Sequence, residues 1–121
     1  MSRTGPNAEL GDGITQLSKL NAKLERMMAK IGTKADTPEF RDRMHQEQTA
    51  TTQLVKSLLV QLTEMTKSPS ASAAVFQRLR QQFDREFRRY QSLNTQMDEK
   101  QVKVIEAVKA QKGAGGHYDE E

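Results

Sequence analysis

The chain has 121 residues, the size of one small domain, and it contains no cysteine. The lack of cysteine excludes disulfides and thiolate metal sites, and the net charge of +3 is too small and too widely spread to predict a nucleic-acid partner. No apolar run approaches the roughly 18 residues of a membrane span, and the first residues do not resemble a signal peptide, so we expect a soluble, cytosolic chain.

The first predicted helix runs from about residue 8 to residue 31. Apolar side chains recur there at steps of three and four residues, as they do on one face of a helix: Ile14, Leu17, Leu24, Met28 and Ile31. Asn21 fills the one place that this pattern skips. It is either a tolerated polar residue in a partly wet layer or a residue that sets helix register. Gly32 follows and is predicted to cap the helix in a left-handed conformation.

The second predicted helix runs from Pro38 to about residue 66. Thr37 is a suitable N-cap, and proline is favoured at the first helical position. The apolar face is interrupted by Glu47 and Thr51, which would lie level with Asn21 in an antiparallel pair. We therefore predict a polar layer in the middle of the bundle. Glu47 either lies at the wet edge of this layer, which its charge favours, or accepts hydrogen bonds from Asn21 or the third helix.

The third predicted helix runs from about residue 71 to residue 109, after a break at Lys67–Ser70 and with Ser70 or Ser72 as its cap. Its apolar face is long and carries most of the aromatic residues: Phe76, Leu79, Phe83, Phe87, Tyr90, Leu93, Met97, Val104 and Val108. The glycine run from residue 113 to residue 116 is predicted to end the helix and to act as a flexible linker. Residues 1–8 and 112–121 are expected to be disordered.

Together these elements predict an all-α fold, an antiparallel up-down-up three-helix bundle formed by residues 9–111. At 1.5 Å per residue the three helices would be roughly 36, 43 and 58 Å long. The third helix is too long for its partners, so its end around Lys103–Lys109 should project beyond the bundle. The two short connections favour antiparallel neighbours, and no segment has the alternation of a β-strand.

The sequence does not predict an enzyme. The two histidines, His45 and His117, are far apart and have no cysteine partner, so neither a metal site nor a catalytic base is expected from them. The glycines at 113–116 follow a helix rather than a strand and do not form a phosphate-binding loop. We therefore expect no catalytic residues, no metal and no cofactor.

Two surfaces are candidates for binding a partner. A groove beside the second and third helices could accept another amphipathic helix, and its candidate residues are Val55, Leu59 and Ile105, unless these side chains widen the core instead. The other candidate is a basic stretch on the third helix, formed by Arg78, Arg85, Arg88 and Arg89. This stretch either binds anionic lipid, RNA or an acidic partner, or is a solvated face with ion pairs such as Arg80–Asp84 and Asp84–Arg88; we favour the solvated face.

The junction between the first two helices resembles that of a known family. Gly32-Thr33, followed by Asp36-Thr37-Pro38-Glu39-Phe40-Arg41, is similar to the hydrophobic-Gly-Thr and Asp-Ser/Thr-Pro-Glu-Leu-Arg segments of endosomal and prevacuolar syntaxins. The polar stretch 48–56 and the spacing of Leu79, Phe83, Phe87 and Gln91 also resemble this family. The resemblance covers about residues 14–110.

The resemblance implies the N-terminal three-helix (Habc) domain of a Qa-SNARE. In that family the domain precedes a linker, a SNARE helix and a C-terminal membrane anchor. It regulates SNARE assembly in vesicle fusion, in some members by folding back on the SNARE helix, and it can bind Sec/Munc-type proteins. The chain would then lie on the cytosolic face of endosomal or prevacuolar membranes, without nucleic acid and as a monomer in isolation. The alternatives are a three-helix adaptor or scaffold protein, or a module that binds anionic membrane or RNA.

Overall fold

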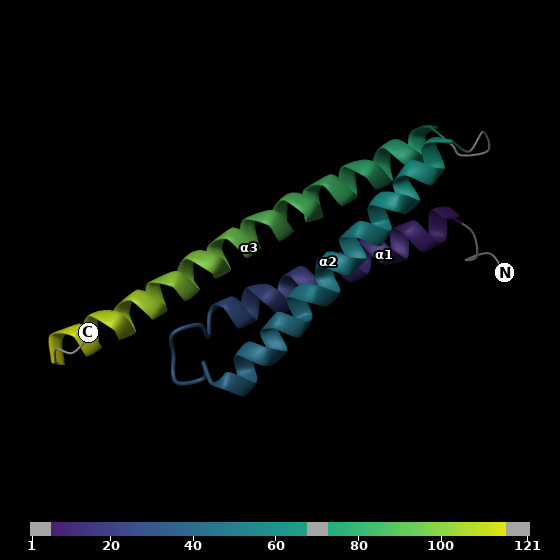
Figure 1. The fold of residues 1–121 in the computed structure, drawn as a ribbon. Helices are drawn as coiled ribbons and strands as arrows, with labels where there is room; N and C mark the ends of the chain where they lie inside the picture. The colour runs from purple at the N-terminus through teal and green to yellow at the C-terminus, as the bar shows by residue number, and fades with distance from the viewer. Residues whose placement is uncertain (1–5, 68–72, 116–121) are drawn as a thin grey trace.

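The computed structural model describes residues 6–67 and 73–115, which form three α-helices. α1 spans Pro6–Met28, α2 spans Pro38–Thr66 and α3 spans Ala73–Gly115. Successive helices run in opposite directions, so the predicted all-α, up-down-up three-helix bundle is confirmed (Figure 1). α1 packs against both other helices, whereas α2 and α3 make few contacts with each other. The two later helices therefore sit on α1 rather than on one another.

α1 begins and ends earlier than the sequence predicts. It ends at Met28 because the amides from Lys30 onward bond three residues back rather than four: Lys30 to Met27 at 2.9 Å and Ile31 to Met28 at 3.2 Å. Gly32 then has φ of 83°, which confirms the predicted left-handed position. At the other end, residues 6–8 are helical rather than disordered, and residues 1–5 of the predicted disordered terminus lie outside the described residues.

α3 is longer than predicted and continues to Gly115, past the expected end at residue 109. Glycine weakens a helix by about 1 kcal/mol relative to alanine, but it can adopt helical dihedrals, so the glycines at 113 and 115 do not stop the helix. With 43 residues against 23 and 29 for α1 and α2, α3 projects beyond the α1–α2 connection, as predicted (Figure 1). The predicted caps Ser70 and Ser72 and the tail 116–121 lie outside the described residues.

The core is split into two apolar clusters by a polar layer. The first cluster contains Leu10, Ile14, Leu17, Val55, Leu58, Leu62, Met65, Leu79, Phe83 and Tyr90. The second contains Leu24, Met27, Ile31, Phe40, Met44, Leu93 and Met97. Between them along the helices, Asn21 and Thr51 are completely buried, each with a relative exposure of 0%. This burial confirms the predicted mid-bundle layer for these two residues.

Gly32→Ala should destabilise the chain by about 1–2 kcal/mol, because an L-residue resists the left-handed conformation. The added Cβ would also lie 3.1 Å from Val104 Cγ2 of α3, so that side chain would have to move. Urea unfolding followed by circular dichroism would measure the change.

Gly11→Ala is the matched control, because Gly11 is helical and its added Cβ would meet nothing closer than Leu79 Cδ2 at 3.7 Å. Here alanine should stabilise α1 by up to about 1 kcal/mol. Equal destabilisation by both substitutions would contradict a specific conformational requirement at Gly32.

Candidate partner-binding surface

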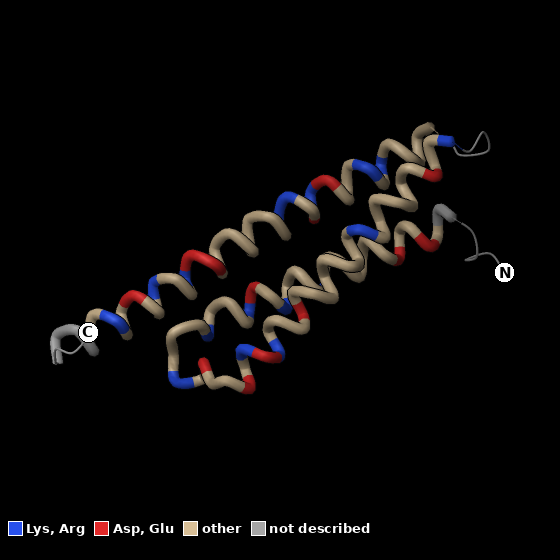
Figure 2. The backbone as a smooth tube through the Cα atoms, viewed as in Figure 1, with Lys and Arg blue, Asp and Glu red and all other residues tan. Residues whose placement is uncertain are grey.

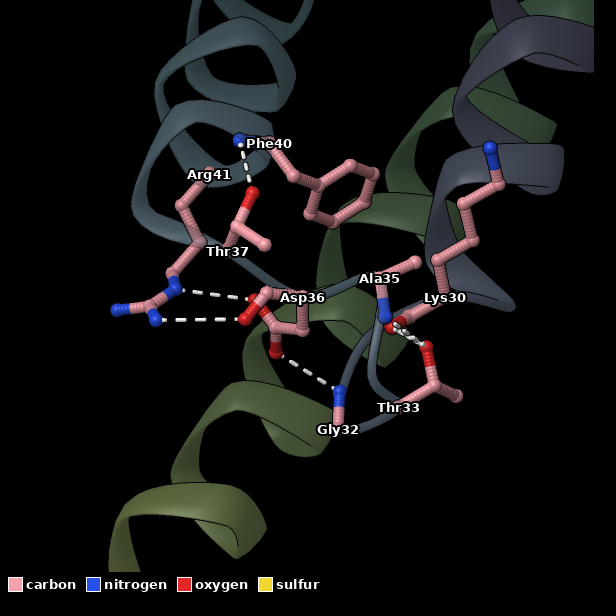
Figure 3. Close-up of polar contacts among 8 residues, drawn as sticks. All are labelled: Lys30, Gly32, Thr33, Ala35, Asp36, Thr37, Phe40 and Arg41. Atoms are coloured by element: carbon pink, nitrogen blue, oxygen red, sulfur yellow. Dashed lines mark hydrogen bonds and ion pairs between the residues drawn. The ribbon is translucent and has the colours of Figure 1, made fainter.

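The α1–α2 junction is held together by its own side chains (Figure 3). Asp36 bridges its two ends: Oδ2 accepts a hydrogen bond from the Gly32 amide at 2.8 Å, and Oδ1 accepts one from Arg41 Nε at 3.0 Å. Thr33 Oγ1 donates to the Lys30 carbonyl at 2.7 Å and accepts from the Ala35 amide at 3.2 Å. The junction residues thus specify one compact loop.

Thr37 completes the junction as the N-cap of α2. Its Oγ1 accepts a hydrogen bond from the Phe40 amide at 3.1 Å, and Pro38 follows at the start of the helix, both as predicted. Phe40 itself is buried in the second core cluster, with 3% of its surface exposed. The cap therefore fixes where α2 begins and also places its first apolar anchor.

α3 contacts this junction from the side. Lys100 Nζ donates a hydrogen bond to the carbonyl of Met28, at the end of α1, at a distance of 3.1 Å. Further along α3, the projecting end forms an open groove of about 500 Å³ with the junction, lined by Asp36, Arg41, Gln101, Val104, Ile105, Val108 and Lys109. Ile105 and Val108 are 53% and 45% exposed there. The projecting end of α3 thus carries apolar side chains that the bundle does not cover.

A second groove lies between α2 and α3 near the opposite end of the bundle. It encloses about 230 Å³ and is lined by Leu59, Leu62, Thr63, Thr66, Phe76, Arg80, Phe83 and Asp84. Leu62 and Phe83 are buried at its floor, whereas Leu59 is 45% exposed at its edge. We call this the α2–α3 groove. It exists because α2 and α3 make so few contacts with each other.

The three residues predicted to share one groove do not lie together. Leu59 lines the α2–α3 groove, but Ile105 lies in the groove at the projecting end of α3. Val55 is 4% exposed and belongs to the first core cluster. Of the two roles left open for Val55, widening the core is therefore the one observed. Helix periodicity could not separate these positions, because all three flank the main apolar stripe.

The polar layer has a member that the sequence did not indicate. Asn21 Nδ2 donates to Glu86 twice, to its backbone carbonyl and to Oε1, both at 3.0 Å. Glu47 instead forms an ion pair with Lys23 at 2.7 Å, with 25% of its side chain exposed. The wet-edge position of Glu47 is thus confirmed, and Asn21 bonds to the third helix rather than to Glu47. Glu86 stands in the arginine-rich stretch of the sequence, where nothing local indicates that it points inward.

Arg89 extends this network to the surface. It contacts Glu25 of α1 at 2.8 Å and Glu86 at 3.3 Å. The hydrogen bond to Glu25 is the main cause that raises the pKa of Arg89; both carboxylates add to the effect and burial opposes it. Arg89 therefore ties α3 to α1 and is not available as part of a free basic surface.

The other predicted basic residues behave differently. Arg78, Arg85 and Arg88 are exposed, and within the described residues none of them forms an ion pair or a side-chain hydrogen bond. Asp84 lies 4.0 Å from Arg80, as predicted. The predicted Asp84–Arg88 pair is absent from the ion pairs between described residues, because Asp84 Oδ2 is directed to the preceding turn instead.

The described residues also limit the chemistry that can be assigned. Across residues 6–67 and 73–115, no three His, Asp or Glu side chains gather closely enough to hold a metal ion. His45 is exposed on α2, and His117 lies outside the described residues. None of the helices in this part of the chain has an apolar stretch long enough to cross a membrane.

Comparison with known proteins points to one family. Residues 7–121 match the family described as syntaxin-like protein. Curated relatives include syntaxin-7 of Rattus norvegicus, Pongo abelii and Homo sapiens, which are 25%, 24% and 23% identical to the chain over 118 residues. These matches cover 93% of the chain and 45% of each relative, so the chain spans less than half the length of the relatives. No solved structure matches the chain.

Proposed function

Because the chain belongs to the syntaxin-like family, we propose that it is the regulatory N-terminal domain of an endosomal t-SNARE that controls membrane fusion by binding helices. The resemblance to endosomal syntaxins that rests on residues 32–41 is confirmed by the family match. In this proposal the domain binds the SNARE helix of its own protein or a Sec/Munc-type protein, on the cytosolic face of endosomal membranes. It performs no chemistry itself.

The observation that supports this proposal most directly is the α2–α3 groove. A three-helix bundle with equal contacts would close this side, but here both helices pack on α1 and leave a groove between them whose accessible apolar surface comes from exposed Leu59 and half-buried Phe76. The polar side chains Arg80 and Asp84 line its rim. An amphipathic helix can bury its apolar stripe on such a surface and place its polar residues at the rim.

Titration calorimetry tests the proposal with two ligands: a peptide of the SNARE helix that this proposal places after the domain, and the Sec/Munc-type protein of the same organism. We expect at least one of them to bind. Leu59→Arg places a charge at the edge of the groove and should weaken this binding by at least roughly tenfold, since a charge facing an apolar contact must be desolvated.

Val60→Arg is the matched control, because Val60 is the next residue of α2, is 61% exposed and does not line the groove. It should change the affinity by less than about threefold. An absence of binding to both ligands would contradict the proposal. Equal weakening of the binding by the two substitutions would mean that the α2–α3 groove is not the binding site.

A further inference from the structure

The outer face of α3 carries three arginines that the fold does not use. Arg78, Arg85 and Arg88 are exposed and have no ionic partner among the described residues. Other arginines on the same structure are engaged, such as Arg41 with Asp36 and Arg89 with Glu25. Figure 2 shows that basic positions outnumber acidic ones along the first half of α3. We call Arg78, Arg85 and Arg88 the Arg face.

These three residues point the same way. Their spacings of seven and three residues place them on one side of an α-helix, over roughly 15 Å along its axis. Gln81 lies between them, and it lines one shallow depression together with Arg85 and Arg88. The acidic residue of that depression, Asp84, places Oδ2 4.0 Å from Arg80 Nε. The result is a straight row of positive charge on the exposed side of α3.

The shape and chemistry of this row select its partner. Guanidinium groups bind phosphate oxygens through paired N–H donors, so phosphate is a suitable ligand. Single-stranded RNA is not favoured, because Phe83 and Tyr90 of the same helix are 2% and 9% exposed and cannot stack on bases. An extended peptide is not favoured either, because the depression beside these arginines is lined only by polar and charged side chains and offers no apolar pocket.

We propose that the Arg face is a contact surface for the phosphate head groups of an anionic membrane. A flat array of phosphates can meet all three arginines of a straight helix at once, and the binding is electrostatic and sensitive to salt. On the circumference of α3 the Arg face lies well away from Phe76 and Phe83, which line the α2–α3 groove. The domain can therefore rest on a membrane and keep that groove open, and the two proposals can fail independently.

Vesicle co-sedimentation tests this directly. The chain should bind vesicles of phosphatidylcholine mixed with phosphatidylserine, and bind vesicles of phosphatidylcholine alone much less. Replacing one arginine near a membrane surface weakens binding about fivefold, so the triple variant Arg78→Gln, Arg85→Gln, Arg88→Gln should bind roughly a hundredfold more weakly. Raising the salt concentration should reduce the binding of the unchanged chain.

The matched control removes the same charge elsewhere. Lys19, Lys56 and Lys103 are exposed and have no ion pair among the described residues. Their triple replacement by glutamine should weaken vesicle binding by less than about tenfold, because these side chains do not share one face. If both triple variants lost vesicle binding equally, the proposal for the Arg face would be wrong, because net charge alone would then explain the binding. If the unchanged chain bound polyuridylate or polyglutamate as strongly as it binds anionic vesicles, the choice of a membrane as the partner would be wrong.

A second measurement does not depend on how the arginine variants fold. The chain has no cysteine, so Gln81→Cys and Val60→Cys can each be labelled at one site with a polarity-sensitive dye. Anionic vesicles should shift the emission of the dye at 81, beside the Arg face, and leave the dye at 60 on α2 nearly unchanged. A larger shift at 60 than at 81 would contradict the proposed orientation.

Discussion

Leu58→Ala is expected to lower the free energy of unfolding by about 2–5 kcal/mol, a large share of the stability of a small domain. Leu58 is completely buried in the first core cluster, where it packs against residues of α1. Truncation removes buried methyl groups and leaves a cavity that a packed bundle can close only in part. Urea unfolding followed by circular dichroism would measure the loss.

The neighbouring leucine provides the control. Leu59 is 45% exposed, so Leu59→Ala should cost less than about 1 kcal/mol. The pair has the same chemistry, the same helix and adjacent positions, and differs in burial. Similar losses from both substitutions would mean that α2 is rotated relative to the orientation described above.

Gly13 makes the same contact testable from the other side. An added Cβ at Gly13 would lie 2.5 Å from Leu58 Cδ2, closer than packed atoms allow. Gly13→Ala should therefore be destabilising by about 1–2 kcal/mol in the unchanged chain, despite the better helix propensity of alanine. In the Leu58→Ala background the clash disappears and the same change should be stabilising by up to about 1 kcal/mol. Additive effects would show that the two helices do not approach closely at Gly13.

The sequence predicts the helices and their order because those features depend on local chemistry. Thr37 and Pro38 mark the start of α2, Gly32 marks the end of the preceding turn, and apolar spacing gives the buried faces. The predicted end of α3 is too early, because the glycines at 113 and 115 only weaken a helix and do not terminate it.

What the sequence did not predict depends on how the helices are rotated and paired. Asn21 could be placed in a polar layer, but its partner Glu86 is 65 positions further along the chain and stands among five arginines. Likewise, Val55 and Leu59 both flank the apolar stripe of α2, and only the unequal packing of the three helices buries one and exposes the other. A single sequence contains no direct signal for which pairs of helices pack closely.

The junction shows why ten residues could carry a family resemblance. Asp36 accepts hydrogen bonds from the Gly32 amide and from Arg41. Thr37 caps α2, and Gly32 adopts the left-handed conformation that the turn needs. Each of these side chains meets a separate requirement of one tight loop, so replacing any of them loses a specific bond or conformation. The α2–α3 groove has no such local signature, because its lining comes from two helices that meet only in the folded chain.

In the polar layer, Asn21→Asp should lower the free energy of unfolding by at least about 3 kcal/mol at neutral pH. Asn21 is 0% exposed and donates both of its Nδ2 hydrogens to Glu86, to the backbone carbonyl and to Oε1. A carboxylate of the same shape loses both donors, faces two acceptor oxygens at about the same distance and buries an uncompensated charge.

The loss should depend on pH with a definite sign. Burial and the neighbouring Glu86 both disfavour the charged form, so the introduced carboxyl should have a pKa above the value of about 3.9 that it has in the unfolded chain. A raised pKa in the folded state means that stability is present below about pH 4 and is lost as the pH rises through the folded-state pKa. The deficit relative to the unchanged chain should therefore shrink on acidification.

Asn21→Leu separates charge from the loss of hydrogen bonds. It removes the same two donors, but it adds no charge, and Glu86 Oε1 keeps its contact with Arg89 at 3.3 Å. Asn21 Oδ1 accepts no hydrogen bond from the described residues, so replacing the side chain with leucine breaks no hydrogen bond at that oxygen. We expect a change within about 1.5 kcal/mol that is the same from acid to neutral pH. Urea unfolding at both pH values would measure it, and a pH-independent loss of equal size in both variants would mean that the layer is wetter than its burial indicates.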